Sequence, residues 1–359
     1  MQKIRKTIFI VTLILAAFGA VMIYSSSAIY AYDKMGDSMF FLKHHLLYLV
    51  LGFACLLAVM SLDLEKLRKH SKKLMLFTFF ILILVLIPKV GVSVAGARRW
   101  FKIGVLSFQP SELAKFVLII YLADFLSRKG YKVKDFFTGY LPCISISALT
   151  CVLILLQPDL GTAIAVIYSA FVLIFIAGGR LTHLLMSVLA SLPLLYYLIF
   201  SVPYRRRRML VFLDPWHDRK GAGFQIIQSF LALGSGGLFG VGLGQSKQKL
   251  FYLPEAHTDF IFSIIGEELG FVGASALLVL FVIFVGVSMQ AFMITDKVFN
   301  KLLIFGIANM IAFEVIINVG VNVGAFPTKG LPLPFISYGG SSLIFHLMAV
   351  GLMLNAMRD

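Results

Sequence analysis

Asp259 is the residue whose type and position most directly suggest chemistry. It ends the charged, histidine-containing stretch FYLPEAHTD at 251–259 and stands directly before an apolar run of membrane length. An ionisable side chain at the mouth of a membrane segment is costly to keep, so Asp259 is a candidate functional residue. Its carboxylate could take a proton as a general base. Capping the following helix is an equally good interpretation, and a cap would hold the carboxylate ionised.

A second pair of candidates opens another apolar run. Glu112 and Lys115 lie three residues apart in SFQPSELAK, where Pro110 and Ser111 form a typical helix start. Residues at this spacing share a helix face, so the two charges can pair where a membrane makes an unpaired charge costly. A purely structural ion pair explains them as well as a functional role does.

Positive charge gathers in two stretches next to these candidates. The stretch at 89–102, KVGVSVAGARRWFK, holds Arg98, Arg99 and Lys102, and the long loop at 202–258 holds Arg205–Arg208. Such cations suit an anionic ligand at a membrane surface and can absorb the charge that develops on a departing phosphate. Attraction to anionic lipid head groups is the alternative interpretation.

Other polar residues in apolar surroundings have structural interpretations. Asp159 is expected to cap a helix, and at least one of Glu267 and Glu268 must find a partner inside the protein. Glu314, Asn318 and Asn322 are spaced by four residues and form a stripe suited to hydrogen bonds between helices. The four histidines at predicted span ends, His44, His45, His183 and His346, lack the spacing of a metal cage.

The glycine-rich stretch at 234–244 resembles a nucleotide-binding loop only superficially. Its glycines fit neither the G-x-G-x-x-G nor the Walker A spacing, so no route to ATP binding is recognisable. We expect instead a flexible stretch that lies on the membrane.

Membrane helices must position all of these residues. Of the 359 residues, 60% are hydrophobic and only 14% are charged, and the mean hydropathy is +0.94. A soluble domain could not cover so much apolar surface. The sequence therefore predicts an all-α polytopic membrane protein. Its ten transmembrane helices are expected at about 7–27, 45–62, 74–88, 111–127, 141–157, 161–178, 183–201, 260–292, 300–323 and 340–357.

The eighth predicted span is too long for one perpendicular crossing. Its 33 residues at 260–292 would extend for roughly 50 Å at about 1.5 Å per residue. We expect a bend, a tilt or a projecting end, with Gly266 and Gly270 as the place to bend or to admit another helix.

The basic residues of the short loops predict the orientation of the spans. Sixteen lysines and arginines lie at the two termini and in one set of short loops, against seven in the opposite set. Both termini are therefore expected in the cytoplasm. The long loop at 202–258, between spans seven and eight, is then extracytoplasmic, on the same side as Asp259 and the 89–102 stretch.

Four ordered segments together resemble the SEDS family of bacterial cell-wall synthesis, the FtsW, RodA and SpoVE group. They are GARRWFKIGVLSFQPSELAK at 96–115, QPDLGTA at 157–163, LPEAHTDFIFSIIGEELGF at 253–271 and PTKGLPLPFISYGGSSL at 327–343. Ten spans with internal termini is also the topology of that family. The third and fourth segments look more like the FtsW branch than the RodA branch.

The resemblance implies a peptidoglycan glycosyltransferase, formed by residues 1–359 as a single membrane domain in the bacterial cytoplasmic membrane. Its substrate would be lipid II, an undecaprenyl-pyrophosphate-linked disaccharide-pentapeptide. Asp259 matches the essential aspartate of the family and is the expected catalytic residue. The expected substrate-binding residues are Arg98, Arg99, Trp100, Lys102, Glu112, Lys115 and His257.

Glycan polymerisation agrees with the residues present. The acceptor 4-hydroxyl must attack C1 of a sugar that leaves a lipid pyrophosphate, so a general base is needed and a nucleotide is not. Cationic side chains or a divalent cation, Mg²⁺ or Mn²⁺, would absorb the charge on the leaving group.

The resemblance also implies partners and leaves alternatives open. A class B penicillin-binding protein and other division or elongation proteins are the expected partners, with spans eight and nine as a docking face, and no nucleic acid is expected. The alternatives are a lipid II flippase, a RodA-type elongation polymerase and a scaffold. A flippase needs polar groups through the whole depth of the membrane, whereas most candidates here lie near the outer face.

Overall fold

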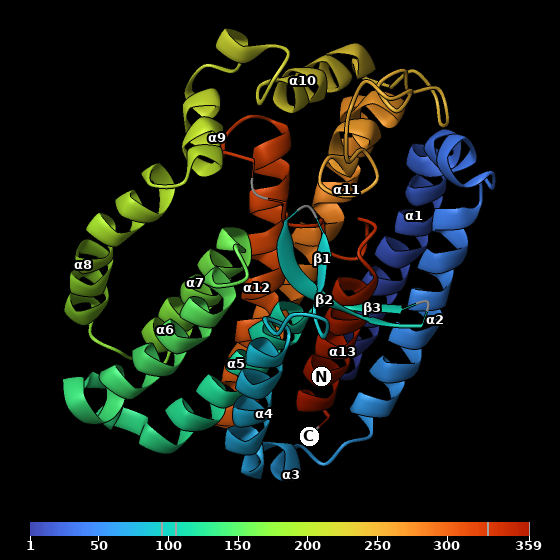
Figure 1. Cartoon of the computed structure of the whole chain (residues 1–359). Helices are drawn as coiled ribbons and strands as arrows, with labels where there is room; N and C mark the ends of the chain where they lie inside the picture. The colour runs from blue at the N-terminus through green and yellow to red at the C-terminus, as the bar shows by residue number, and fades with distance from the viewer. Residues whose placement is uncertain (95, 105, 329, 359) are drawn as a thin grey trace.

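Long helices form the body of the computed structural model, and a small sheet lies beside them (Figure 1). The structure describes residues 1–94, 96–104, 106–328 and 330–358, without the side chains of Val94 and Ile103. Lys329, one of the seven basic residues predicted to be external, lies outside the described residues.

Thirteen α-helices occur in the described part of the chain. They are α1 (Gln2–Met35), α2 (Phe40–Met60), α3 (Leu64–Lys69), α4 (Ser71–Leu84), α5 (Pro110–Lys129), α6 (Leu141–Leu155), α7 (Leu160–Ile176), α8 (Leu181–Phe200), α9 (Pro203–Leu213), α10 (Phe224–Gly236), α11 (Ile261–Ile294), α12 (Val298–Asn322) and α13 (Gly340–Ala356). Shorter helical turns are η1 (Gly130–Lys134), η2 (Phe136–Tyr140) and η3 (Pro215–Asp218). Each predicted span coincides with one α-helix, while α3, α9 and α10 were not predicted.

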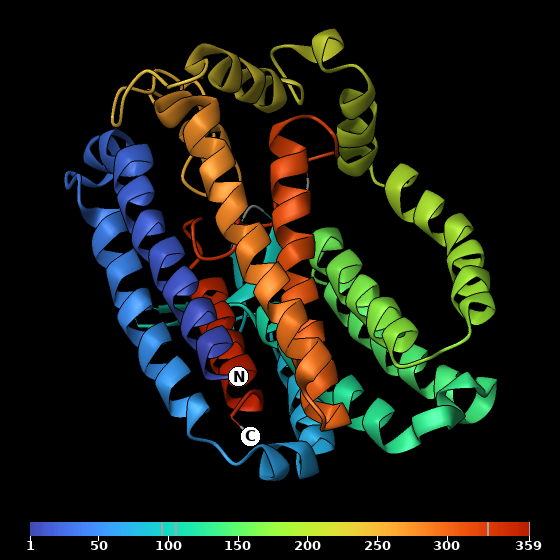
Figure 2. The ribbon, with the colours of Figure 1, turned by 180° about the vertical axis from the view of Figure 1, so that it is seen from behind.

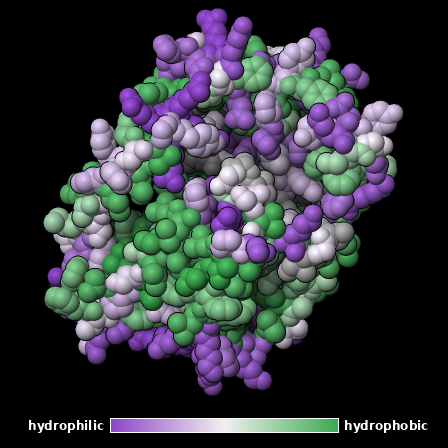
Figure 3. Space-filling model, in the orientation of Figure 1, coloured by the Kyte–Doolittle hydropathy of each residue, from purple (hydrophilic) through white to green (hydrophobic). Residues whose placement is uncertain are grey.

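The helices are those of a multi-pass membrane protein. Among the described residues, six helical segments are long and apolar enough to cross a membrane: α1, α2, Phe136–Leu155, α8, α11 and α12. The helices α7 and α13 are also apolar but shorter. On the face that Figure 3 shows, hydrophobic residues form a broad band between two hydrophilic ends.

The segment between α4 and α5 is an antiparallel sheet, which the all-helical prediction did not include. Its strands are β1 (Val92–Val94), β2 (Ala97–Ile103) and β3 (Leu106–Phe108), in the order β1-β2-β3. Phe101 pairs with Phe108, and their rings stack with centroids 6.2 Å apart. Valine and aromatic residues favour strands, and here they outweigh the helical context of the chain.

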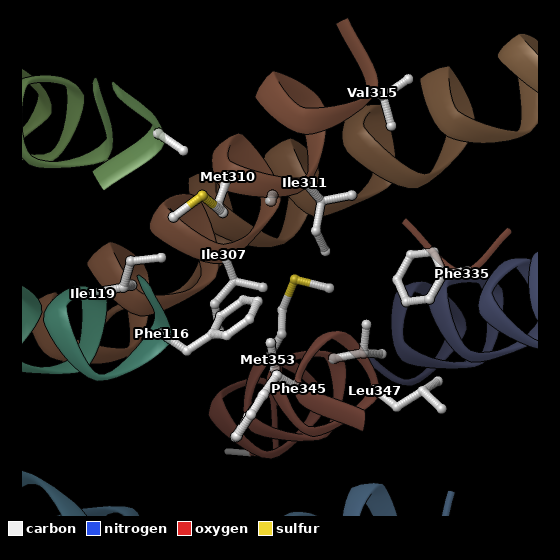
Figure 4. Close-up of a cluster of buried hydrophobic side chains, with 14 of the residues drawn as sticks. Phe116, Ile119, Ile307, Met310, Ile311, Val315, Phe335, Phe345, Leu347 and Met353 are labelled. Atoms are coloured by element: carbon white, nitrogen blue, oxygen red, sulfur yellow. The ribbon is translucent and has the colours of Figure 1, made fainter. Parts of the chain in front are cut away.

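The core of the bundle is built around α12. In the most apolar stretch of α12, 67% of the residues are buried, against 6% in α8, which contacts the bundle mainly through α7. Figure 4 shows side chains of three helices meeting in this core, among them Phe116 of α5, Ile307 and Ile311 of α12, and Phe345 and Met353 of α13. Residues on α5, α12 and α13 are therefore held in fixed relative positions, whereas α8 is the peripheral helix.

The helix α11 is interrupted at Gly270, as the length of the eighth span predicted. Gly270 has φ 68° and ψ −169°, which is not helical. The glycine-rich stretch fills this break: the Val241 and Gly242 N–H groups donate to the Glu267 and Glu268 carbonyls at 3.0 Å. A Cβ on Gly240 would collide with the Glu268 carbonyl oxygen, so a close approach requires glycine there. The prediction of a flexible stretch lying on the membrane is therefore corrected.

Both glutamates beside this break have partners, as was expected of at least one. The Glu268 carboxylate accepts from Lys249 Nζ at 2.8 Å and from Ser25 of α1. Glu267 accepts from the Ser246 hydroxyl and from the Lys247 N–H at 3.0 Å. These contacts fix the end of the long loop to α1 and α11.

The helices of the long loop and the two chain ends lie at opposite ends of the molecule. Figures 1 and 2 show α9 and α10 across one end of the bundle, while N and C both lie toward the end that carries α3. The segment at 202–258 is thus a helical cap over the end where α11 begins.

Candidate active site

Asp259 lies in the turn that leads into α11, and its side chain is half-buried. The N-cap of α11 is Phe260, which makes no side-chain cap, and the first-turn N–H of Ser263 donates to Asn322 Oδ1 at 3.1 Å. The capping role that the sequence left open for Asp259 therefore does not apply. Its carboxylate is not committed to the helix and is available for another role.

The backbone around Asp259 is held by side chains of other segments. The amide nitrogens of Asn318 and Asn322 each donate to the Asp259 carbonyl oxygen at 3.0 Å. The Ser337 hydroxyl donates to the Thr258 carbonyl at 2.6 Å, and the Tyr338 N–H donates to the His257 carbonyl at 2.9 Å. Three successive carbonyls are fixed, so the backbone position of Asp259 is determined by α12 and the 331–338 segment.

The surroundings of Asp259 raise its proton affinity. Burial, together with the negative charges of Glu255 and Asp159, raises the pKa of Asp259 to about 6, although Arg208 opposes the shift. A carboxylate with this pKa is still mostly ionised at neutral pH and is a stronger base than a surface aspartate. Both properties suit a general base.

Space beside the carboxylate depends on a glycine. Gly330 has φ 62°, and a Cβ placed on it would lie 3.0 Å from Asp259 Oδ2. A side chain at this position would therefore crowd the carboxylate and would also be strained.

Arg208 is the cation that faces Asp259 from the long loop. It lies on α9, over the Tyr204 ring at 4.3 Å, and donates to the Thr328 carbonyl at 3.2 Å. The sequence indicated Arg205–Arg208 only as a group, because a run of four arginines does not show which of them turns toward the site.

Glu112 and Lys115 form the predicted ion pair, but the pair lies inside the bundle. Their charged atoms are 2.9 Å apart, and Lys115 also donates to Glu314 of α12. Glu314 in turn contacts His346 Nε2 of α13 at 2.5 Å. The side chains of Lys115, Glu314 and His346 are fully buried, so the structure supports the structural interpretation of the pair. A substrate-binding role for Glu112 and Lys115 stays a prediction.

The basic stretch lies on the sheet, and its arginines differ in exposure. Arg99 donates to the Gln157 and Pro158 carbonyls at 2.8 and 2.6 Å, which ties β2 to the turn before α7. Neutral carbonyls leave the positive charge of Arg99 uncompensated. Arg98 and Lys102 are exposed, while Trp100 is half-buried and pairs with Val92 of β1. Pyrophosphate binding by these residues stays a prediction.

Two further predicted residues have defined surroundings. His257 packs among the rings of Tyr30, Phe41 and Tyr338, with centroids 5.6, 4.5 and 5.9 Å away, and burial lowers the pKa of His257. It is a neutral member of an aromatic cluster, and substrate binding by it stays a prediction. Asp159 caps α7 through the Thr162 N–H at 3.1 Å, as expected.

The described residues do not form a metal cage. No group of three or more His, Cys, Asp or Glu side chains within them is arranged to hold an ion. Participation of a divalent cation stays a prediction.

The site contains residues whose functional position was not predicted. Asn318 and Asn322 were expected to join helices, and their contact with the Asp259 backbone was not foreseen. The spacing of the polar stripe was the available signal. No local pattern indicated that the partner of Asn322 would be a loop carbonyl 63 residues earlier in the chain.

Known proteins match this chain over nearly its whole length. A family model described as "Cell cycle protein", which represents FtsW, RodA and SpoVE, matches residues 5–359. The chain belongs to this FtsW/RodA/SpoVE family. The resemblance of the four segments is thereby confirmed.

Curated family members are similar over nearly their full length. The "Probable peptidoglycan glycosyltransferase FtsW" of Geobacter sp. (strain M18) is 45% identical over 348 residues, which are 97% of this chain and 95% of the relative. "Stage V sporulation protein E" of Bacillus subtilis (strain 168) is 45% identical over 349 residues, again 97% and 95%.

Solved structures of the family share the fold. One chain, from the work described as "Structural coordination of polymerization and crosslinking by a peptidoglycan synthase complex", has a TM-score of 0.82 and 34% identity. The match covers 98% of this chain and 97% of that one. RodA of Thermus thermophilus has a TM-score of 0.73 and 30% identity, covering 98% and 96%.

Proposed function

We propose that this chain is a peptidoglycan glycosyltransferase that polymerises lipid II at the outer face of the bacterial cytoplasmic membrane, with Asp259 as the general base. A relative that is 45% identical over 97% of the chain is named a probable peptidoglycan glycosyltransferase. The observation that carries the assignment of Asp259 is its environment: a fixed backbone, a carboxylate that caps no helix, and a pKa raised to about 6.

The reaction requires one proton transfer and one leaving group. The acceptor 4-hydroxyl oxygen forms a bond with C1 of the donor sugar, while the bond from C1 to the pyrophosphate oxygen breaks. The hydroxyl proton passes to the Asp259 carboxylate and from there to water, and the lipid pyrophosphate departs with the bonding electrons. Because the donor is already activated, no nucleotide takes part.

Positive side chains near the same face would stabilise the departing pyrophosphate. Arg208 is already within electrostatic range of Asp259, and Arg98 and Lys102 are exposed on β2. A charge-assisted hydrogen bond from such a cation strengthens as negative charge grows on the leaving group. Arg99 would contribute less to this stabilisation, because its guanidinium already donates hydrogen bonds to two carbonyls.

The proposed topology has ten spans with both termini in the cytoplasm. It assigns α1, α2, α4–α8 and α11–α13 to the membrane and the helices of the 202–258 loop to the outer face, with residues 1–359 acting as one membrane domain. The distribution of basic residues supports this orientation, as does the placement of N and C at the end opposite α9 and α10.

The buried charges argue against the alternative of a lipid II flippase. Lys115, Glu314 and His346 lie in the interior, where a transport path would need polar groups, but their side chains are fully buried and bonded to one another. A closed network of this kind offers no polar path to a moving head group.

We propose a class B penicillin-binding protein as the partner that crosslinks the new strand. A similar solved chain comes from a peptidoglycan synthase complex that coordinates polymerisation and crosslinking. The names of the relatives favour a division or sporulation member over a RodA-type elongation polymerase, since FtsW and Stage V sporulation protein E relatives are both 45% identical, and RodA is 30% identical.

Polymerisation in detergent separates the enzyme from a transporter. The purified chain is incubated with labelled lipid II in micelles, with and without a class B penicillin-binding protein, and the products are separated on a gel. Micelles have no two sides, so transport cannot produce a signal. We expect a ladder of glycan chains. Lipid II that stays monomeric under both conditions would contradict the proposed function.

A further inference from the structure

A basic cavity lies at the opposite end of the molecule from Asp259. Its volume is about 390 Å³, and it is formed where α3 and the start of α4 meet the end of α5. This is the end that carries the chain termini in Figure 1, and its surface is hydrophilic in Figure 3. The proposed active site uses none of its residues.

A buried carboxylate organises the cavity. Asp124, only 4% exposed, accepts from Arg68 Nε at 3.2 Å and from Arg128 Nε and Nη2 at 3.0 and 2.9 Å. The Ser71 hydroxyl donates to the same carboxylate at 2.7 Å. The two guanidinium groups are therefore held in place, which lowers the entropy lost when a ligand binds them.

The remaining lining residues leave the cavity positive. Lys69 and Lys72 are exposed, and neither forms an ion pair within the described part of the chain. Glu65 lies 3.5 Å from Arg68 Nη1. The lining thus has four cations and two carboxylates, and both carboxylates are already engaged with arginines. This is an excess of charge that fits a phosphate group.

An apolar surface continues from the cavity along α4. Leu76 and Phe80 follow Lys72 at intervals of four residues, so the three share one helix face. Leu76 is 66% exposed and Phe80 is 60% exposed. A ligand with a phosphate at the cavity and a hydrocarbon chain along this face would match both surfaces.

We propose that this cavity binds the phosphodiester head group of an anionic membrane phospholipid, with an acyl chain along Leu76 and Phe80. Basic pockets between helices on the cytoplasmic side suit such head groups, and each lysine near the surface strengthens the attraction. The apolar face of α4 favours a lipid over a soluble phosphate. The inference is independent of the proposed catalytic function.

Native mass spectrometry of the full chain tests the site. The purified protein is titrated with phosphatidylglycerol or with zwitterionic phosphatidylcholine, and the bound lipid is counted. We expect phosphatidylglycerol to be preferred. The double variant Lys69→Gln/Lys72→Gln should bind it about 30-fold more weakly, because each lysine contributes about fivefold. Asp124, Arg68 and Arg128 stay intact, so the fold is preserved.

A matched control separates a site from general attraction. Lys132→Gln/Lys134→Gln removes the same charge from η1, where both lysines are exposed and outside the cavity. This variant should bind phosphatidylglycerol as the unmodified chain does. An equal loss in both double variants, or no loss in either, would overturn the proposal.

Two soluble probes identify the source of the phosphate. Glycerophosphoglycerol has the same head group without acyl chains, and inorganic phosphate has neither. Both should compete only weakly with phosphatidylglycerol. Competition by either probe at the same concentration as the lipid would mean that the cavity binds a soluble phosphate compound without help from an acyl chain, and it would refute the lipid assignment.

Discussion

Asp259 combines a fixed position with a raised proton affinity. Its carbonyl is bonded to two asparagines, and its carboxylate interacts electrostatically with Glu255, Asp159 and Arg208. Ionising a desolvated carboxylate costs folding free energy. Because the pKa is about 6 in the folded chain and 3.8 for an ordinary aspartate, this group favours folding most below pH 4. That contribution is lost as the pH rises through about 6, so the ionised form of Asp259 that the proposed reaction needs is the less stable one for the fold.

The pH dependence of polymerisation should report this carboxylate. A general base works only when ionised, so kcat/KM should fall below about pH 6 instead of below about pH 4. Glu255→Gln removes a negative charge and should therefore lower the pKa of Asp259 and shift the acidic limb to lower pH. Initial rates of lipid II consumption between pH 4.5 and 8 measure the shift.

Asp33→Asn is the control for that profile. Asp33 is exposed and pairs with the neighbouring Lys34 at 3.3 Å, so its replacement should leave the limb in place. An acidic limb that stays fixed in Glu255→Gln, or that moves equally in both variants, would contradict the electrostatic account of Asp259.

At the scale of elements, α12 connects the candidate active site to the core. One end of this buried helix carries Asn318 and Asn322, which hold the turn before α11, and Glu314 joins it to α5 and α13. A displacement of α12 would therefore be transmitted to the Asp259 backbone.

Removing one anchor should impair catalysis more than stability. Asn322→Ala leaves buried groups unpaired at a cost of about 1–3 kcal/mol, and it removes one of the two hydrogen bonds to the Asp259 carbonyl and the bond to the Ser263 N–H. Misplacing a catalytic group by about 1 Å can cost roughly a hundredfold in rate, so kcat should fall at least tenfold. The measurements are kcat and the thermal unfolding midpoint in detergent.

Asn300→Ala is the matched control on the same helix. Asn300 is buried at the other end of α12 and donates to the Ala356 carbonyl at 3.0 Å. Its replacement should lower the unfolding midpoint while kcat stays near that of the unmodified chain. Equal losses of kcat in the two variants would show that Asn322 acts only through general stability.

Replacing different members of the buried network of Glu112, Lys115 and Glu314 should reduce stability by unequal amounts. Lys115→Met leaves Glu112 and Glu314 without their shared cation, and breaking a buried pair in this way costs about 3–5 kcal/mol. Glu112→Gln leaves Lys115 paired with Glu314 and should be much milder. Thermal unfolding in detergent measures both. If the two variants unfold at the same temperature, the network does not have the connectivity described.

The helices were predictable from the sequence to a greater extent than the site. The ten helices that coincide with predicted spans, the interruption near Gly270 and the pairing of Glu112 with Lys115 follow from apolar run length and helical spacing, which are local properties. The sheet at 92–108 was missed because its strands are short and contain charged residues, so the segment resembles a loop. The contacts of Asn318, Asn322 and Arg208 join segments far apart in the chain, so no local pattern could indicate them.

At the scale of the whole molecule, the long loop is a structured cap instead of a loose connection. Its glycine-rich stretch at 234–244 fills the break in α11, and Lys249 joins the loop to Glu268. The cap also brings Arg208 to the active site, while α8 leads to it along the edge of the bundle (Figures 1 and 2). A partner that moved the cap could therefore change the site without adding residues to it.

Binding of a class B penicillin-binding protein should consequently raise polymerase activity. We place its docking face on the outer ends of α11 and α12, and the partner would shift the site toward a competent state. Copurification from native membranes, followed by polymerisation assays with and without the partner, tests this. The partnership is wrong for this chain if no such protein copurifies and none stimulates the purified enzyme.

The most direct test of the account is polymerisation by Asp259→Asn. The amide has nearly the shape of the carboxylate but cannot accept the hydroxyl proton, so the purified variant should form no glycan ladder from lipid II. Its thermal unfolding midpoint should equal or exceed that of the unmodified chain, because a desolvated charge has been removed. Absent product with unchanged folding is the predicted result. Substantial turnover by a folded Asp259→Asn variant would contradict the assignment of Asp259 as the general base.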